Sequence, residues 1–236
     1  MDRFKRQILA DEKRIYRTDK RRQQKLETRI RILDAALDHF SRRGFEAAAV
    51  RDIAADAGVT HAVIRLHFGT KDQLWREAVS QLFARFEQEM ADPPEEPTSA
   101  TPSLAQFIRR YVLYSARHPE HARIMMHESM EPSERLSWMV DTYVIPAHRR
   151  VMPALERAVQ GRRLPAMSLV SLIYIISSSG QSLFMLGAEA KLIYGIDVAA
   201  PETIDQHVAA VLALLRISYG STVGADRQSE GAIGIA

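Results

Sequence analysis

The side chains best suited to chemistry lie in one short segment, from Thr60 to Lys71. Val59, Ile64 and Phe68 recur at helical spacing, so they share the inner face of a helix. The remaining positions face outward or lie at the flank: Thr60, His61, Ala62, Val63, Arg65 and Leu66. Short polar or basic side chains on an exposed helix face fit the base edges and phosphates of a DNA groove, and Ala62 permits close backbone approach. Lys71 begins the next expected helix, where free N–H groups and the helix dipole favour an anion.

Other chemistries find little support in the sequence. The chain has no cysteine, which excludes disulfides, thiolate nucleophiles and cysteine-ligated zinc. His118, His121 and His127 lack a convergent carboxylate pattern, so we expect no metal. We identify no Ser-His-Asp arrangement, glycine-rich phosphate loop or carboxylate pair, and therefore expect neither a cofactor nor an enzyme.

Three short helices and a longer one should position this segment. The first is expected over Arg29–Arg42, with Thr28 as N-cap, a buried stripe of Ile30, Leu33, Leu37 and Phe40, and Gly44 at its end. A second helix is expected over Val50–Ala57, then a Gly58-Val59 turn and a third over Thr60–Phe68. Thr70 should cap a fourth over Lys71–Met90. The two helices joined by the tight turn have helix-turn-helix geometry.

The rest of the chain also has a helical pattern, which predicts an all-α fold. Further helices are expected over Ser103–Arg117, Glu120–Met130, Ser133–Gln160, Ala166–Ala190 and Glu202–Ile217. Pro146 and Pro153 should kink or split the third of these. We divide the chain into a basic arm (1–27), a helix-turn-helix domain (28–75), a helical dimerisation and effector-binding domain (76–219) and a flexible tail (220–236). A proline-rich surface loop is expected over 92–98.

Charge is distributed unevenly along the chain. The first 31 residues contain twelve Lys or Arg and five Asp or Glu, a net charge of +7, so the remainder sums to −4. A basic end indicates a polyanionic partner, although a solvated tail would look the same. Arg21, Arg22 and Lys25 are the candidates for DNA backbone or minor-groove contact.

The segment 164–188 has no charged residue and is long enough to span a bilayer. Its six consecutive polar or small residues, 177–182, favour a helix packed among other helices, so we expect no membrane partner. Nothing near the start resembles a signal peptide, which favours the cytosol.

The residues from Thr28 to Leu74 resemble the DNA-binding domain of the TetR family of bacterial regulators. The matching pieces are ILDAAL (32–37), Phe40, Gly44-Phe45, DIAADAGVT (52–60) and HFGTKDQL (67–74). The resemblance implies that Thr28 and Lys71 contact phosphate and that His61, Ala62, Val63 and Leu66 face bases. It places Arg65 and His67 at the backbone or groove edge. The alternative for His61 and His67 is a surface position without a base contact.

Two departures from the family pattern stand out. Arg65 replaces the usual tyrosine, and its guanidinium can bind a phosphate or a guanine edge. Ala48 and Ala49 replace the usual Thr or Ser before the second helix, which removes a cap worth about 1 kcal/mol. We expect Arg51 to substitute for the lost phosphate contact.

The last two helices are expected to form an intersubunit four-helix bundle, as the resemblance implies. The candidate interface residues are Tyr174, Ser178, Gln181, Val208, Val211, Leu212 and Leu215. Large soft residues suit either an apolar effector pocket or an ordinary core. The pocket candidates are Phe107, Tyr111, Tyr114, Met125, Met126, Trp138, Tyr143, Tyr174, Gln181 and Phe184.

These features together predict a homodimeric repressor of a palindromic operator, controlled by a small apolar or aromatic effector. One alternative is a helical small-molecule-binding enzyme or carrier. The other is a sequence-tolerant DNA-coating protein driven by the basic arm.

Overall fold

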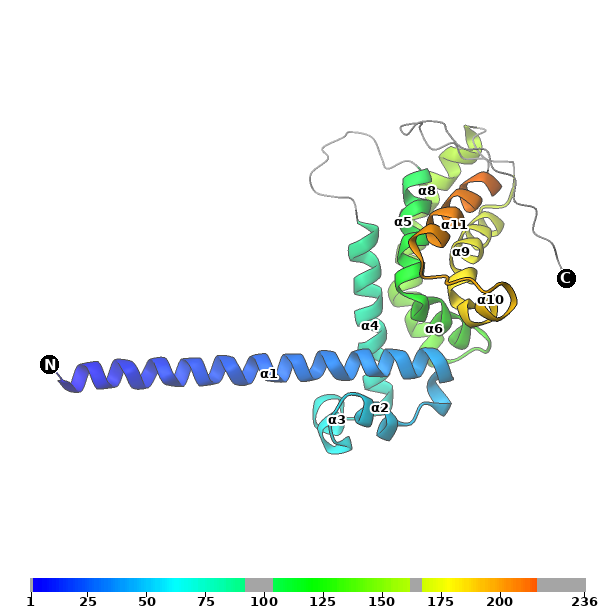
Figure 1. Ribbon diagram of the computed structural model, residues 1–236. Coiled ribbons are helices and arrows are strands. Elements are labelled where there is room, and N and C mark those ends of the chain that lie inside the picture. The colour runs from blue at the N-terminus through cyan, green and yellow to red at the C-terminus, as the bar shows by residue number, and fades with distance from the viewer. Residues whose placement is uncertain (1, 92–103, 162–166, 216–236) are drawn as a thin grey trace.

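The computed structural model describes residues 2–91, 104–161 and 167–215, while the side chains of residues 2–19 and of Arg21 lie outside this description. Every regular element in the described ranges is helical, in agreement with the predicted all-α class (Figure 1). The elements are α1 (Asp2–Ala47), α2 (Val50–Asp56), α3 (His61–Phe68), α4 (Lys71–Met90), α5 (Leu104–Arg117), α6 (Pro119–Ser129), α7 (Glu134–Met139), the π-helix η1 (Val140–Val144), α8 (Ile145–Gln160), α9 (Leu169–Met185), α10 (Gly187–Tyr194) and α11 (Pro201–Leu214).

Helix α1 begins far upstream of the predicted start at Arg29 and projects away from the body (Figure 1). The prediction of Thr28 as an N-cap is therefore wrong. Its hydroxyl donates to the Gln24 carbonyl at 2.8 Å, the bond that a threonine makes inside a helix. The prediction that Ile30 is buried is also wrong, since 43% of it is exposed. Gly44, with φ of +72°, interrupts α1 near its end as expected.

The first hydrophobic core joins α1, α2, α3 and α4 and continues into α6 and α7. Its buried members include Leu33, Phe40, Ile53, Ile64, Phe68, Trp75, Ile124 and Met139. Helix α6 packs along α1, so the helix-turn-helix rests on the second half of the chain. This shared core crosses the domain boundary that we placed after residue 75.

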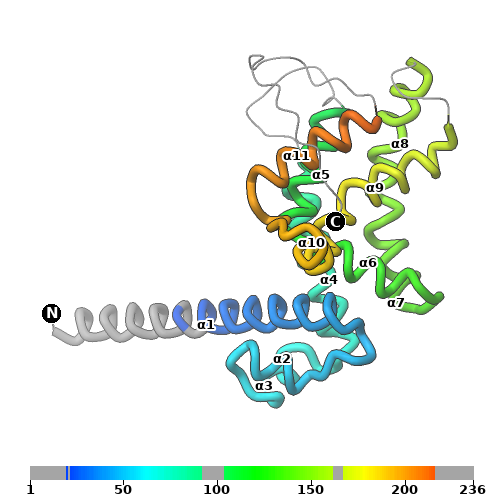
Figure 2. The backbone as a smooth tube through the Cα atoms, turned by 45° about the vertical axis from the view of Figure 1, so that its right-hand side comes forward, coloured from blue at the N-terminus to red at the C-terminus, as the bar shows by residue number. Residues whose placement is uncertain are grey.

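The second core lies among α5, α8, α9 and α11 (Figure 2). The predicted helix 133–160 is split into α7, η1 and α8, with Pro146 in the first turn of α8 and Pro153 inside it. The predicted helix 166–190 is split at Leu186 into α9 and α10. The expected loop at 92–98 and tail at 220–236 lie outside the described residues.

No single helix in the described ranges is long and apolar enough to cross a bilayer. Helices α9 and α10 meet that requirement only as a pair, and they are bent by 65° relative to each other.

Candidate DNA-binding surface

Helix α3 presents a short outward face above a firmly buried inner face. Ile64 and Phe68 are 3% and 5% exposed and belong to the first core, as the spacing predicts. His61, Ala62, Arg65 and Leu66 are exposed, and 83% of Leu66 is accessible. Val63 and His67 are half-buried at the flanks. An exposed leucine of this size has no packing role within the subunit, so its side chain is available to a partner.

The turn before α3 depends on a left-handed glycine. Gly58 has φ of +64°, a conformation that glycine adopts without the steric cost borne by other residues. The amides of Gly58 and Val59 donate to the carbonyls of Ala55 and Ala54, at 3.1 and 2.9 Å, which closes the end of α2. The two helices are thus held in a fixed crossing.

Helix α2 is attached to α1 by an ion pair near its start and a hydrogen bond to a histidine at its end. Arg43 Nη1 lies 3.2 Å from Asp52 Oδ2, and His39 Nε2 lies 2.6 Å from Asp56 Oδ2. Ala49 at the N-cap makes no side-chain capping bond, as predicted from the missing Thr or Ser. Arg51 is exposed in the first turn of α2, a position open to a phosphate.

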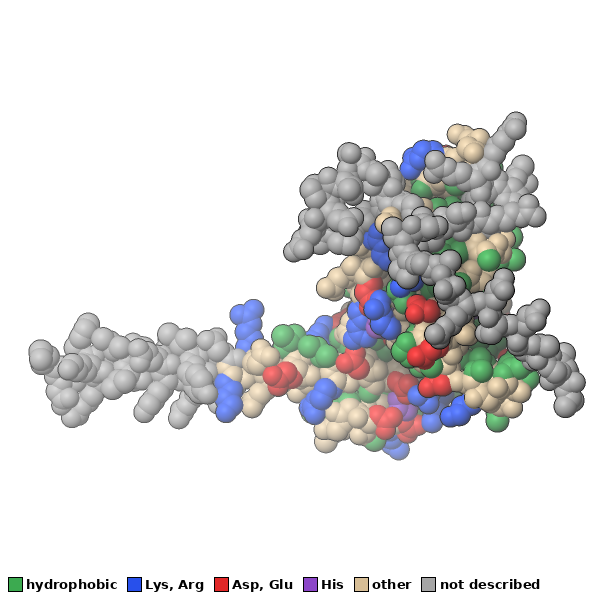
Figure 3. All heavy atoms as spheres, turned by 45° about the horizontal axis from the view of Figure 1, so that its top comes forward, with side chains coloured by type: hydrophobic (Ala, Val, Ile, Leu, Met, Phe, Trp, Pro, Cys, Tyr) green, Lys and Arg blue, Asp and Glu red, His purple; other side chains and the backbone are tan. Residues whose placement is uncertain are grey.

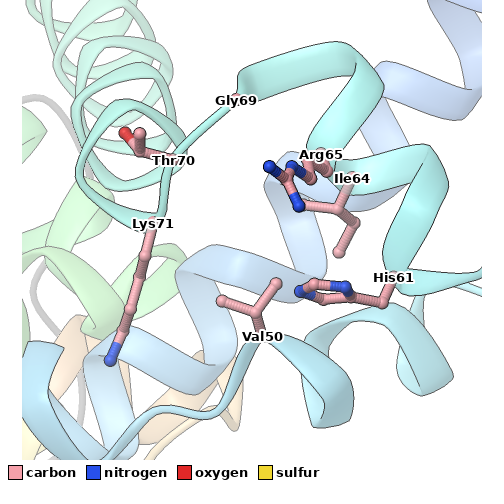
Figure 4. Close-up of a pocket in the computed structure, with 7 residues that line it drawn as sticks. All are labelled: Val50, His61, Ile64, Arg65, Gly69, Thr70 and Lys71. Atoms are coloured by element: carbon pink, nitrogen blue, oxygen red, sulfur yellow. The ribbon is translucent and has the colours of Figure 1, made fainter.

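Lys71 lies at the rim of a hollow between the starts of α2, α3 and α4 (Figure 4). The lining residues are Val50, His61, Ile64, Arg65, Gly69, Thr70 and Lys71. Thr70 caps α4 as predicted, and its Oγ1 accepts from the Gln73 amide at 3.1 Å. The Lys71 amine donates to the Glu46 carbonyl at 3.2 Å and lies 4.7 Å from the centre of the Phe45 ring. A lysine amine has three donors, so two remain for an anion.

The flank of α3 nearest α1 carries His67. Burial is the main cause that lowers the pKa of His67, and the charges of Lys25 and Arg29 lower it further. Arg29 pairs with Glu77 and lies 4.8 Å from the centre of the Phe68 ring. In the protein without DNA, these effects favour the neutral form of His67.

Basic side chains continue along α1 beyond the helix-turn-helix. Arg22 and Lys25 are exposed, and Lys and Arg side chains gather where the described side chains of α1 begin (Figure 3). Arg21 lies outside the side-chain description. The exposed positions suit contact with a polyanion that runs past α3.

Two family models match this chain, one over the helix-turn-helix and one over the second half. Residues 32–78 match the model of bacterial regulatory proteins of the tetR family, and residues 101–214 match a tetracyclin repressor-like C-terminal domain. The chain belongs to the TetR family. It is thereby grouped with DNA-binding regulators and not with enzymes, which removes the helical enzyme as an interpretation.

Individual relatives within the TetR family match over shorter lengths. The transcriptional repressor NicS of Pseudomonas putida is 31% identical over 48% of this chain and 54% of its own length. The repressor Rv3405c of Mycobacterium tuberculosis is 56% identical over 18% of this chain and 23% of its own. The chain therefore spans about half of NicS and about a quarter of Rv3405c. The SCO4942 structure from Streptomyces coelicolor shares the fold, with a TM-score of 0.58, 20% identity and coverage of 79% of this chain and 97% of its own.

The residues proposed for the effector pocket of this TetR-family chain are divided between two cores. Met125, Trp138 and Tyr143 pack against the first core, next to the helix-turn-helix. Phe107 and Phe184 belong to the second core or pack against it. The Tyr111 hydroxyl donates to Gln181 Oε1 at 2.8 Å across α5 and α9, and Tyr114 is buried on α5. Met126 and Tyr174 are exposed, so they line no interior space.

The predicted dimer stripe on α11 requires correction. Val208, Val211, Leu212 and Leu215 are each at most 6% exposed and lie in the second core of their own subunit. Helical periodicity identifies a buried face, but it does not distinguish a partner helix of the same chain from one of another chain. Tyr174 and Ser178 are exposed on α9 and remain interface candidates, while Gln181 is half-buried against Tyr111.

Our sequence analysis missed a set of apolar side chains that α9, α10, α11 and the junction between α9 and α10 leave exposed. Its exposed members are Val170, Ile175, Leu186, Leu192, Ile193, Tyr194 and Leu214, with 88% of Leu192 accessible. The run Leu192-Ile193-Tyr194 before Gly195 was the available signal, since three apolar residues in a row at a helix end cannot all face inward.

Proposed function

We propose that this TetR-family chain is a transcriptional repressor that binds a palindromic operator as a homodimer. The observation that carries the proposal is the outward face of α3. His61, Ala62 and Leu66 are exposed above a core that fixes the helix, and they have the sizes and chemistry needed to read base edges. Repression is supported by the names of two relatives, NicS and Rv3405c.

The proposed contacts divide into two kinds. His61, Ala62, Val63 and Leu66 would read bases, with Leu66 against a thymine methyl. The phosphate contacts would come from Arg51, Thr60, His67 and Lys71, and from Arg21, Arg22 and Lys25 on α1. Thr28 would join them once its hydroxyl turns away from the Gln24 carbonyl to which it donates. Arg65 and Lys71 both line the hollow, and a phosphate is the ligand that we propose for the Arg65 guanidinium.

Dimerisation would bury exposed apolar side chains of α9, α10 and α11. Tyr174 and Ser178 face outward on α9, and large exposed apolar patches mark association surfaces. The small side chains Ala209, Ala210 and Ala213 are exposed on α11, where they would permit close helix packing. A two-fold dimer would place two α3 helices about one DNA turn apart, which is the geometry for an inverted repeat.

The proposed effector is a small apolar or aromatic molecule bound among α5, α6 and α9. Tyr111, Tyr114 and His121 supply hydrogen-bonding groups there among aromatic rings. Because its DNA partner lies in the bacterial cytoplasm, we expect the protein to act there. Binding of an effector should raise the melting temperature and change the affinity for DNA, and a screen of aromatic compounds by thermal shift measures the first effect.

Selection of bound sequences from random duplex DNA tests the proposal. The purified full chain should enrich an inverted repeat with two equivalent half-sites. Sequence-independent binding that collapses with salt would instead favour the DNA-coating alternative and reject an operator-specific regulator.

A further inference from the structure

Arg135 of α7 reaches from the second half of the chain to the end of α1. Its guanidinium carbon lies 3.8 Å from the centre of the Phe45 ring, and its Nη2 lies 3.6 Å from Glu46 Oε1. Lys71 approaches the same two residues from the start of α4, with its amine 4.7 Å from the Phe45 ring centre and 3.2 Å from the Glu46 carbonyl. The Phe45–Glu46 segment is therefore contacted by one cation from each half of the chain, Lys71 and Arg135.

A buried carboxylate fixes Arg135 in this position. Arg135 Nε donates to Glu128 Oε2 at 3.2 Å, and the Glu128 side chain on α6 is only 5% exposed. A buried carboxylate without a partner is costly, so the pair holds α6 and α7 together. The planar guanidinium can bond a carboxylate and stack on a ring at the same time, which a lysine amine cannot do.

We propose that Arg135 is a positioning residue for DNA binding, which fixes the Phe45–Glu46 segment and, through it, the Lys71 amine. This inference rests on the proposed function, in which Lys71 contacts an operator phosphate. The Glu46 carbonyl takes one of the three Lys71 donors and aims the amine, while Arg135 holds the residue that carries this carbonyl. A displacement of α6 or α7 would therefore change the position of a phosphate-binding cation.

The test is a double-mutant cycle on DNA affinity. Arg135→Gln, Lys71→Met and the double variant are measured by fluorescence anisotropy on a labelled duplex carrying the selected inverted repeat. A scrambled duplex of equal length is measured in parallel, across a salt series. Arg135→Gln should weaken binding to both duplexes about fivefold to tenfold and reduce the salt slope by up to about one, as loss of one phosphate contact does. The double variant should bind as weakly as Lys71→Met alone, within about twofold, because both changes remove the same contact.

Two further variants keep the inference falsifiable. Arg135→Lys keeps the positive charge beside Glu128, so it replaces Arg135→Gln in the test if the glutamine variant does not fold. It should still weaken DNA binding because the stacked, planar contact is lost. Arg149→Gln, at an exposed arginine on α8, is the matched control and should bind like the wild type. The role of Arg135 is overturned if the affinity losses of Arg135→Gln and Lys71→Met add in the double variant and the salt slope of Arg135→Gln is unchanged. It is also overturned if Arg135→Lys binds DNA like the wild type. A wild-type protein that binds neither duplex overturns the proposed function itself.

Discussion

Gly44→Ala is expected to destabilise the fold because of a specific backbone conformation. Gly44 has φ of +72° and ψ of 171°, a region that is essentially restricted to glycine. A Cβ added there would also lie 3.3 Å from His127 Nδ1 on α6. The substitution therefore combines backbone strain with a close contact between α1 and α6.

The two costs can be estimated separately. Strained backbone of this kind costs about 1–3 kcal/mol, and a side chain that must yield by a few tenths of an ångström adds less than that. Gly195→Ala is the matched control, because Gly195 has φ of +68° and ψ of 10°, in the left-handed helical region, with nothing within 4 Å of the added Cβ. That region costs a non-glycine residue about 1–2 kcal/mol. Gly44→Ala should therefore lower the free energy of unfolding by more than Gly195→Ala.

Denaturant unfolding at a fixed protomer concentration measures both variants, since a dimer's stability depends on that concentration. Adding His127→Ala to Gly44→Ala should restore only the part due to the side-chain contact. A Gly44→Ala variant no less stable than Gly195→Ala would refute the backbone argument. Complete recovery in the double variant would show that the contact, and not the φ angle, causes the loss.

Three other substitutions test separate parts of the structure. His61→Ala should relax preference at one position of each half-site, costing about 1–3 kcal/mol there, whereas an equal loss on all sequences would reject its base-reading role. Ser178→Arg should convert the proposed homodimer to monomers in sedimentation equilibrium, while Ser137→Arg, at an exposed serine on α7, should leave the homodimer intact. Burial lowers the pKa of His121 from 6.5 in the unfolded chain to about 4 in the folded protein. As the pH falls, the unfolded chain therefore takes up a proton on His121 before the folded protein does. Stability should therefore fall by about 3 kcal/mol as the pH drops from about 6.5 to 4, and His121→Leu should flatten that part of the unfolding profile.

The helix-turn-helix was predictable because its boundaries depend on local signals. Thr70 caps α4 through its own hydroxyl, and Gly58 adopts the left-handed conformation that ends α2. Both features are encoded within a few residues of where they act. The inner face of α3 follows in the same way from the spacing of Ile64 and Phe68.

The start of α1 was mispredicted because a residue that is able to cap a helix does not by itself make a helix begin there. The residues before Thr28 are mostly good helix formers, with no glycine or proline among them, so nothing stops the helix there. The Thr28 hydroxyl then bonds to the carbonyl four residues earlier instead of capping. The prediction that the apolar stripe of α11 forms the dimer interface was wrong for a different reason. Val208 and Leu212 are already buried against other helices of the same subunit.

The placement of the first core bears directly on regulation. The Trp75 and Trp138 rings of α4 and α7 meet at 5.7 Å, and Phe83 stacks on Tyr143 of η1 at 4.5 Å. Because packed interiors resist continuous deformation, α7 and η1 cannot move far without moving α4. Helix α4 begins with Lys71, beside α3, so a ligand that shifts the packing of α7 also acts on the DNA-facing surface. A linker between independent domains would not transmit such a shift, whereas a core shared by both halves does.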